Sequence, residues 1–197
     1  MRAARYLVSI LIMLCATTVR AQMPVSPLTI AETKIVRFAP TLPVGGYAQE
    51  GWCGSESLMV TRPGAWRCSV ANAIHDPCFA VPTNREQLVC DADPAPKAEG
   101  FVLKLMKPLP ESSHLDRKPE PWVFRLADNS ICNATLHANG HLRRWKCTIY
   151  IRDQIRPDGV VTALTPGKIW MADKVPESAI GTEGAKPEKI PVKMIWE

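Results

Sequence analysis

The sequence has no stretch of about 20 consecutive apolar residues, the length that a helix needs to cross a bilayer. It has no glycine-rich phosphate loop and no dinucleotide-binding fingerprint, which argues against nucleotide-dependent chemistry. None of its cysteines shows the paired Cys-x-x-Cys spacing of a zinc module. Helical periodicity is weak except in one short segment. We therefore expect no transmembrane segment, no cofactor, no metal site and no largely helical fold.

The excess of positive charge is also small. The chain has 24 basic and 19 acidic residues, but Arg2, Arg5 and Arg20 lie in a segment that we expect to be removed. The remaining 21 basic residues leave a net charge of +2, which gives no argument for a nucleic-acid partner.

The start of the chain has the features of a secretory signal. Two arginines precede a short apolar run over residues 6–16, and Val19 and Ala21 occupy the −3 and −1 positions of a cut before Gln22. We expect residues 1–21 to be a signal peptide and the protein to be secreted or periplasmic. Cys15 would leave with this segment, because the bulky Leu14 before it does not suit a lipoprotein cleavage site. Lipidation of Cys15 is nevertheless left open.

Six cysteines remain in the mature chain, and an even number in an exported protein indicates three disulfides. They are Cys53, Cys68, Cys78, Cys90, Cys132 and Cys147. For the first four we favour the sequential pairing, Cys53–Cys68 and Cys78–Cys90, and the other two arrangements stay open.

The last pair follows from a hairpin. Asn139-Gly140 lies between two alternating runs, which is a strong signal for a two-residue turn. Such a turn places Cys132 opposite Cys147, at a separation that a disulfide can span. We therefore predict the Cys132–Cys147 disulfide.

Further alternating or β-rich runs predict strands. They lie at residues 35–38, 101–106, 122–127, 160–164, 168–172 and 192–196. A three-residue loop or bulge at Asp128–Ser130 would keep Leu126 and Cys132 on the same face. Pro63 can begin a helix, and Trp66 and Val70 are one turn apart, so we predict a short helix over Pro63–Ala71. The proline-bearing stretch Lys107–Pro121 reads as a long loop of the kind that is often functional.

Together these patterns predict a mainly β protein, a small antiparallel barrel or sandwich with one short helix in the cysteine-rich region. Residues 22–44 are expected to form a loose N-terminal arm that ends in a first strand. Residues 45–197 are expected to form a single disulfide-stabilised β domain.

The runs Ala65-Trp66-Arg67-Cys68, Asp76-Pro77-Cys78-Phe79 and Val89-Cys90-Asp91 resemble a group of secreted bacterial proteins of unknown function. The chain departs from that group in having Trp52-Cys53 in place of Cys-Trp and Asp128-Asn129 in place of Asp-Gly. The resemblance implies a bacterial source, export and disulfides, and it implies no activity.

Catalytic candidates are few. His75 and Asp76, with Ser55, are the residue types of an acid–base–nucleophile set. Ser55, however, lies in Gly-Ser-Glu-Ser and not in a Gly-x-Ser-x-Gly elbow, and Asp76-Pro77 suits an ordinary turn. His137 and His141 would lie on opposite faces of the predicted hairpin, which argues against a shared metal ion.

Trp52 and Trp66 lie beside the cysteines, where an exposed indole suits recognition of a sugar or a peptide. The sequence therefore favours a non-catalytic binding or inhibitor-like domain that contacts an unidentified envelope or extracellular protein or glycan. The alternative is a small exported hydrolase that uses His75 and Asp76.

Overall fold

The computed structural model describes residues 31–43, 45, 47–94, 99–112, 121–136, 142–152 and 154–197. The expected signal peptide, the predicted turn Asn139-Gly140, and His137 and His141 lie outside these residues. No helix of the described part of the chain is long and apolar enough to span a membrane.

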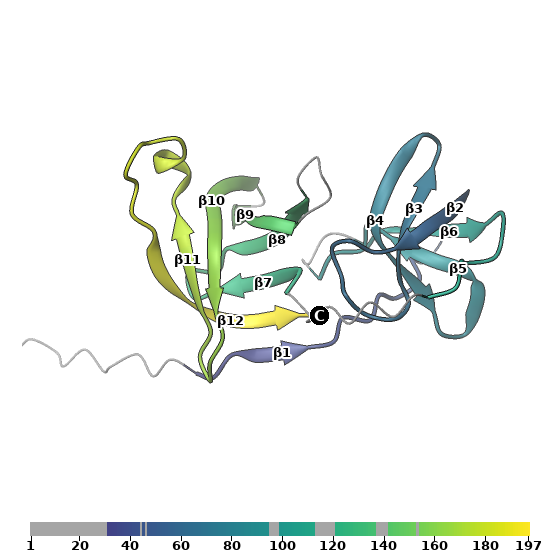
Figure 1. The fold of residues 1–197 in the computed structure, drawn as a ribbon, viewed down its shortest axis with the longest axis horizontal. Coiled ribbons are helices and arrows are strands. Elements are labelled where there is room, and N and C mark those ends of the chain that lie inside the picture. Colours follow the sequence, from purple (N-terminus) through teal and green to yellow (C-terminus); the bar gives the residue numbers. More distant parts are fainter. Residues whose placement is uncertain are drawn as a thin grey trace, which may run out of the picture.

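The fold is mainly β, as predicted, and consists of two small closed barrels that lie side by side (Figure 1). In the first barrel, neighbouring strands are antiparallel except β2 and β6, whose parallel pairing closes the ring. Its strands are β2 (Ala48–Glu56), β3 (Ala65–Val70), β4 (Ala73–Val81), β5 (Asn84–Cys90) and β6 (Phe101–Leu105).

The second barrel is an antiparallel ring that closes between its last and first strands. A single 3-10 turn, η1 (Glu177–Ala179), lies between its last two strands. The strands are β7 (Val123–Leu126), β8 (Ile131–Leu136), β9 (Leu142–Ile151), β10 (Gln154–Thr165), β11 (Met171–Val175) and β12 (Glu188–Trp196).

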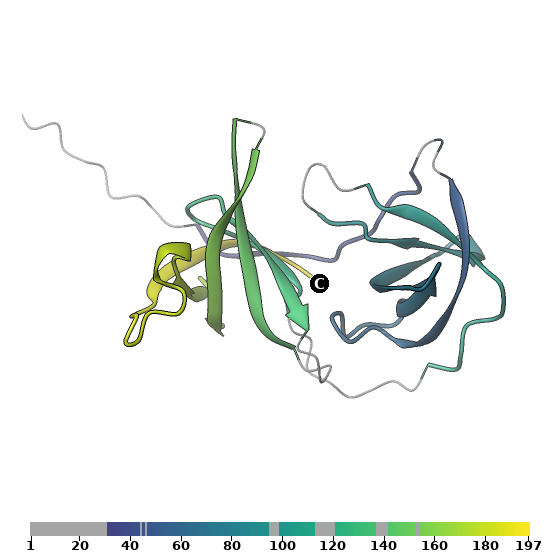
Figure 2. The ribbon, with the colours of Figure 1, turned by 90° about the horizontal axis from the view of Figure 1, so that it is seen from above.

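The N-terminal arm ends in a strand, as expected. β1 (Lys34–Val36) pairs in parallel with the end of β12. Phe38 then lies between the barrels, with its ring centroid 5.5 Å from that of Phe79 in the first barrel and 5.6 Å from that of Trp122 beside the second. The C-terminus also lies between the two barrels in both views (Figure 1, Figure 2). There, Arg62 Nη1 donates a hydrogen bond to the carbonyl oxygen of Glu197 at 2.6 Å.

One hydrophobic cluster therefore joins residues of both barrels, while a second lies within the first barrel and contains Cys53, Cys68, Cys78 and Cys90. Residues 45–197, expected as one domain, hold two barrels with a shared core. Whether they unfold as one unit stays a prediction.

The three disulfides join Cys53 to Cys68, Cys78 to Cys90 and Cys132 to Cys147, the pairing favoured from the sequence. Each pair lies directly opposite across a strand ladder. The predicted register of β8 and β9 holds from Ile131 to Thr135 and shifts at Leu136, which pairs with Leu142.

The helix predicted over Pro63–Ala71 is wrong, because this segment contains β3. Its side chains alternate in burial, and Cys68 must face Cys53 across the ladder to form the disulfide. Ala71 and Asn72 both adopt positive φ and make the tight two-residue turn into β4.

The loop predicted at Asp128–Ser130 begins one residue earlier in the structure than predicted. Arg125 pairs with Ile131, and the backbone N–H of Leu126 donates to the carbonyl oxygen of Ser130 at 2.9 Å, so the three-residue loop is Ala127–Asn129. The side chains keep the predicted face, because a shift of the pairing by two residues preserves the alternation.

Candidate functional site

A groove of about 830 Å³ lies at one end of the first barrel. Its lining comes from β3 and β4 with their neighbouring turns, from Glu86 on β5, and from the end of β6 with the chain beyond it. It is lined by Gly64, Trp66, Ala80, Val81, Pro82, Glu86, Leu105, Met106, Lys107, Pro108 and Leu109.

Trp66 connects this groove to the core. It pairs with Glu56 on β2 and Cys78 on β4, and only 5% of its surface is exposed. Its Nε1 has no hydrogen-bond partner, although a buried indole N–H usually finds one. The disulfide-containing core therefore holds one face of the groove in place through Trp66.

The wall formed by residues 106–109 is fixed at both ends. The backbone N–H of Met106 donates to the carbonyl oxygen of Gly51 at 2.8 Å. Three residues after Leu109, the hydroxyl of Ser112 donates to the carboxylate of Glu56. Leu109 also packs against the core of the first barrel. Contacts within the chain thus hold this wall in place, and part of the proline-bearing stretch predicted as a functional loop lines the groove.

Two charged side chains mark the rim. The ammonium group of Lys107 lies 4.1 Å from the centroid of the Trp52 ring, which is a cation–π contact. Glu86 is exposed. Within the described part of the chain, neither Lys107 nor Glu86 forms an ion pair with a side chain of opposite charge.

The two tryptophans predicted as contacts lie in different places. Trp66 lines the groove, whereas Trp52 is 42% exposed, is not among the lining residues and contacts Lys107 at the rim. Gly54 lets the Trp52 ring lie against the strand, because a Cβ at this position would be 2.9 Å from the ring. Contact of either indole with a ligand stays a prediction.

The hydrolase candidates do not meet in one set. Asp76 accepts hydrogen bonds from the hydroxyl of Ser57 and from the backbone N–H of Leu58, the latter at 3.0 Å. Burial raises the pKa of Asp76, although the hydrogen bond from Ser57 opposes this. The hydroxyl of Ser55 donates to the carbonyl of Glu56 at 3.1 Å. Asp76 therefore fixes the loop after β2.

His75 has a different carboxylate partner. Its Nδ1 lies 2.8 Å from Oδ2 of Asp91, and its ring packs edge-on against Phe101 with centroids 4.9 Å apart. Among the described residues, no serine hydroxyl is hydrogen-bonded to His75. The geometry provides an oriented imidazole without a nucleophile beside it.

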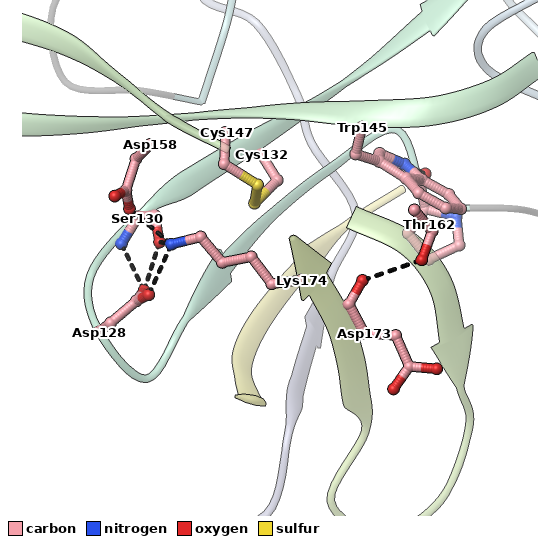
Figure 3. The surroundings of a disulfide bond; sticks show 10 residues. Asp128, Ser130, Cys132, Trp145, Cys147, Asp158, Thr162, Asp173 and Lys174 are labelled. Carbon is pink, nitrogen blue, oxygen red and sulfur yellow. Dashed lines mark hydrogen bonds and ion pairs between the residues drawn. A yellow bond between two sulfur atoms is a disulfide. The ribbon is translucent and has the colours of Figure 1, made fainter. Parts of the chain in front are cut away.

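A cluster that the sequence analysis missed lies in the second barrel near the Cys132–Cys147 disulfide (Figure 3). Lys174 is 5% exposed, and its ammonium group lies 2.8 Å from Asp128, 2.6 Å from Asp158 and 3.0 Å from the hydroxyl of Ser130. The groups come from β11, the β7–β8 loop region and a bulge in β10. No local sequence pattern links such distant positions.

Serine and lysine at this distance are also the parts of a catalytic dyad. Burial alone would lower the pKa of Lys174, but its hydrogen bonds to Asp128 and Asp158 outweigh burial and raise it. A protonated amine cannot act as a base, and Ser130 is fully buried. The arrangement therefore suits a structural ion-pair cluster.

The closest approach to a metal-ligand set among the described residues is formed by Cys68, Cys78 and Cys90. Their sulfur atoms lie within 4.8 Å of one another. All three are in disulfides and so offer no thiolate to a metal ion.

Comparison of this chain with models of protein families, with curated proteins and with solved structures finds no match.

Proposed function

We propose that this protein is an exported, non-catalytic binding domain and that its partner binds in the groove above Trp66. One observation carries the proposal: the groove is preformed, largely apolar and built on a disulfide-containing core. A pocket of several hundred cubic ångströms with a few polar groups is typical of a ligand site.

The polar side chains that could act in catalysis already form hydrogen bonds or ion pairs that hold the fold together. Their structural roles support a binding function over a catalytic one. Asp76 holds a loop, Ser57 caps the same loop, and Lys174 is ion-paired. The three disulfides and the features of a signal peptide support export, since disulfides persist in oxidising compartments.

Filling the groove tests the proposal. Ala80 lines it and Ala73 is exposed on the same strand, so Ala80→Leu and Ala73→Leu are matched changes. With Nile red as an uncharged apolar probe, the unmodified protein and Ala73→Leu should bind equally, and Ala80→Leu should bind at least about fivefold more weakly. Equal binding by all three proteins would contradict the proposed site.

The hydrolase remains the second candidate, favoured only by the contact between His75 and Asp91. An assay with p-nitrophenyl acetate separates the two. A binding domain predicts the same background rate for the unmodified protein and His75→Ala, whereas a hydrolase predicts a rate that His75→Ala abolishes.

A further inference from the structure

We propose that the groove accepts an extended polypeptide segment that places an apolar side chain over Trp66, with a basic residue near Glu86 and an acidic residue near Lys107. This inference rests on the proposed function, because it names the ligand class of the same groove.

The groove forms where β5 and the chain that follows β6 separate. The last pair between β5 and β6 is Gln87 with Lys104, yet β5 begins three residues earlier at Asn84. The chain after β6 stays with β2, through the hydrogen bond from Met106 to Gly51, and so leaves β5. Residues of both separated segments, Glu86 on β5 and Leu105–Leu109 at and beyond the end of β6, line the groove, so an extended chain can lie between two strand-like segments.

The lining argues against a glycan. Only Glu86 and Lys107 among its residues carry a charged side chain, and none carries a hydroxyl or an amide group. Each buried sugar hydroxyl without a partner would cost about 2 kcal/mol or more.

The rim argues against an acyl chain with an anionic headgroup. Such a ligand would satisfy the apolar lining and Lys107, but it would bring negative charge toward Glu86. A polypeptide supplies both signs of charge around an apolar side chain. The opposite charges of Glu86 and Lys107 are therefore complementary to a peptide.

Synthetic peptides test this directly. The probe is a nine-residue alanine-based peptide with a central leucine, one lysine two positions away and one glutamate two positions away on the other side. Both charge orders are used, since the structure leaves the chain direction open, and a central-glycine version is the control. Calorimetry with the full mature protein should show binding of one charge order, weakened about tenfold or more by glycine.

Charge variants locate the contacts. Glu86→Gln should weaken binding of the preferred peptide about five- to tenfold, as should Lys107→Gln. The controls are Glu50→Gln and Lys104→Gln, which are exposed on strands of the same barrel outside the groove and should change nothing. As a rescue, Glu86→Lys should prefer a peptide in which glutamate replaces the lysine.

Hydrogen exchange of residues 84–87 and 105–109 separates the possible failures. Protection by the peptides, lost in the charge variants, supports the inference. Protection by laurate or by a chito-oligosaccharide but by no peptide overturns the polypeptide ligand and leaves the groove as a binding site. No protection by any of these probes overturns the proposed function as well.

Discussion

At the scale of single residues, Lys174 is the most constrained charge of the second barrel. Its side chain is 6% exposed, and the carboxylates of Asp128 and Asp158 lie within hydrogen-bond distance. Removing one member of a buried ion pair leaves the others without compensation. The cluster is therefore expected to matter far more for stability than an ion pair at the surface.

Lys174→Met should lower the free energy of unfolding by about 3 kcal/mol at neutral pH. The matched control is Lys189→Met, because Lys189 is 66% exposed and pairs with Asp173 at 2.9 Å. Its loss should cost less than about 1 kcal/mol. Urea denaturation of both variants measures the difference, and equal losses would show that the cluster has no special role.

The same cluster should make stability depend on pH. Burial raises the pKa of Asp128, but its hydrogen bonds with Lys174 and Ser130 outweigh burial and hold that pKa below its usual range. A carboxyl with a lowered folded pKa contributes stability above its unfolded pKa of about 4, and this contribution is lost as the pH falls through the folded value.

We therefore expect the stability gap between the unmodified protein and Lys174→Met to narrow below about pH 4. Lys174 has a raised pKa, so its contribution is present below about pH 10 and is lost only at higher pH. Chemical denaturation at pH 7, 4 and 2.5 provides the measurement. If the difference in unfolding free energy stays constant or widens on acidification, the ion pairs of Lys174 do not cause that difference.

At the scale of elements, the bulge in β10 aims Asp158 at Lys174. The pairing of β10 with β9 shifts between Pro157 and Gly159, and Gly159 adopts a φ of 107°. A Cβ at Gly159 would lie 2.2 Å from the carbonyl oxygen of Val175. Only glycine fits both the conformation and the space.

Gly159→Ala should therefore destabilise the protein by about 3 kcal/mol or more. Gly184 has a similar need for positive φ, at 76°, but open space around its Cα. Gly184→Ala should cost only about 1 kcal/mol, the conformational part alone. Thermal denaturation compares them, and similar melting temperatures would refute the steric argument.

Strand patterns and cysteine spacing predicted much of the fold but little of the candidate site. The Asn139-Gly140 signal predicted the pairing of Cys132 with Cys147, which the structure shows. A shift of this pairing by one residue would turn every side chain of the strand to the other face of the sheet, so the apolar pattern allows only one register. The spacing of Trp66 and Val70 suited a helix as well as a strand, and the disulfide to Cys53 decides for the strand. A short run cannot reveal such a tertiary constraint.

The groove could not be predicted from the sequence, because it too depends on tertiary contacts between distant segments. Trp66 was named as a contact, but its opposite wall at Leu105–Leu109 is 39 or more positions away in the sequence. Two barrels also cannot be distinguished from one by alternation alone. The packing of Phe38, Phe79 and Trp122 is part of what joins them.

At the scale of the whole molecule, this aromatic contact should couple the barrels. Phe38 is half-buried between them, whereas Ile35 in the same arm is 50% exposed. Phe38→Ala should cost about 2 kcal/mol, less than a fully buried phenylalanine, and should separate the unfolding of the barrels into two calorimetric transitions. Ile35→Ala should keep a single transition. If both variants behave alike, the aromatic contact does not couple the barrels.

The groove above Trp66 is the proposed place where this molecule meets its partner. Titration of the isotopically labelled mature protein with N-acetyl-leucine methylamide, followed by two-dimensional NMR, measures this residue by residue. We predict saturable shifts at Gly64, Ala80 and Leu105, and none around His75 and Asp91. Shifts confined to the surroundings of His75, or none at millimolar probe, would contradict the account.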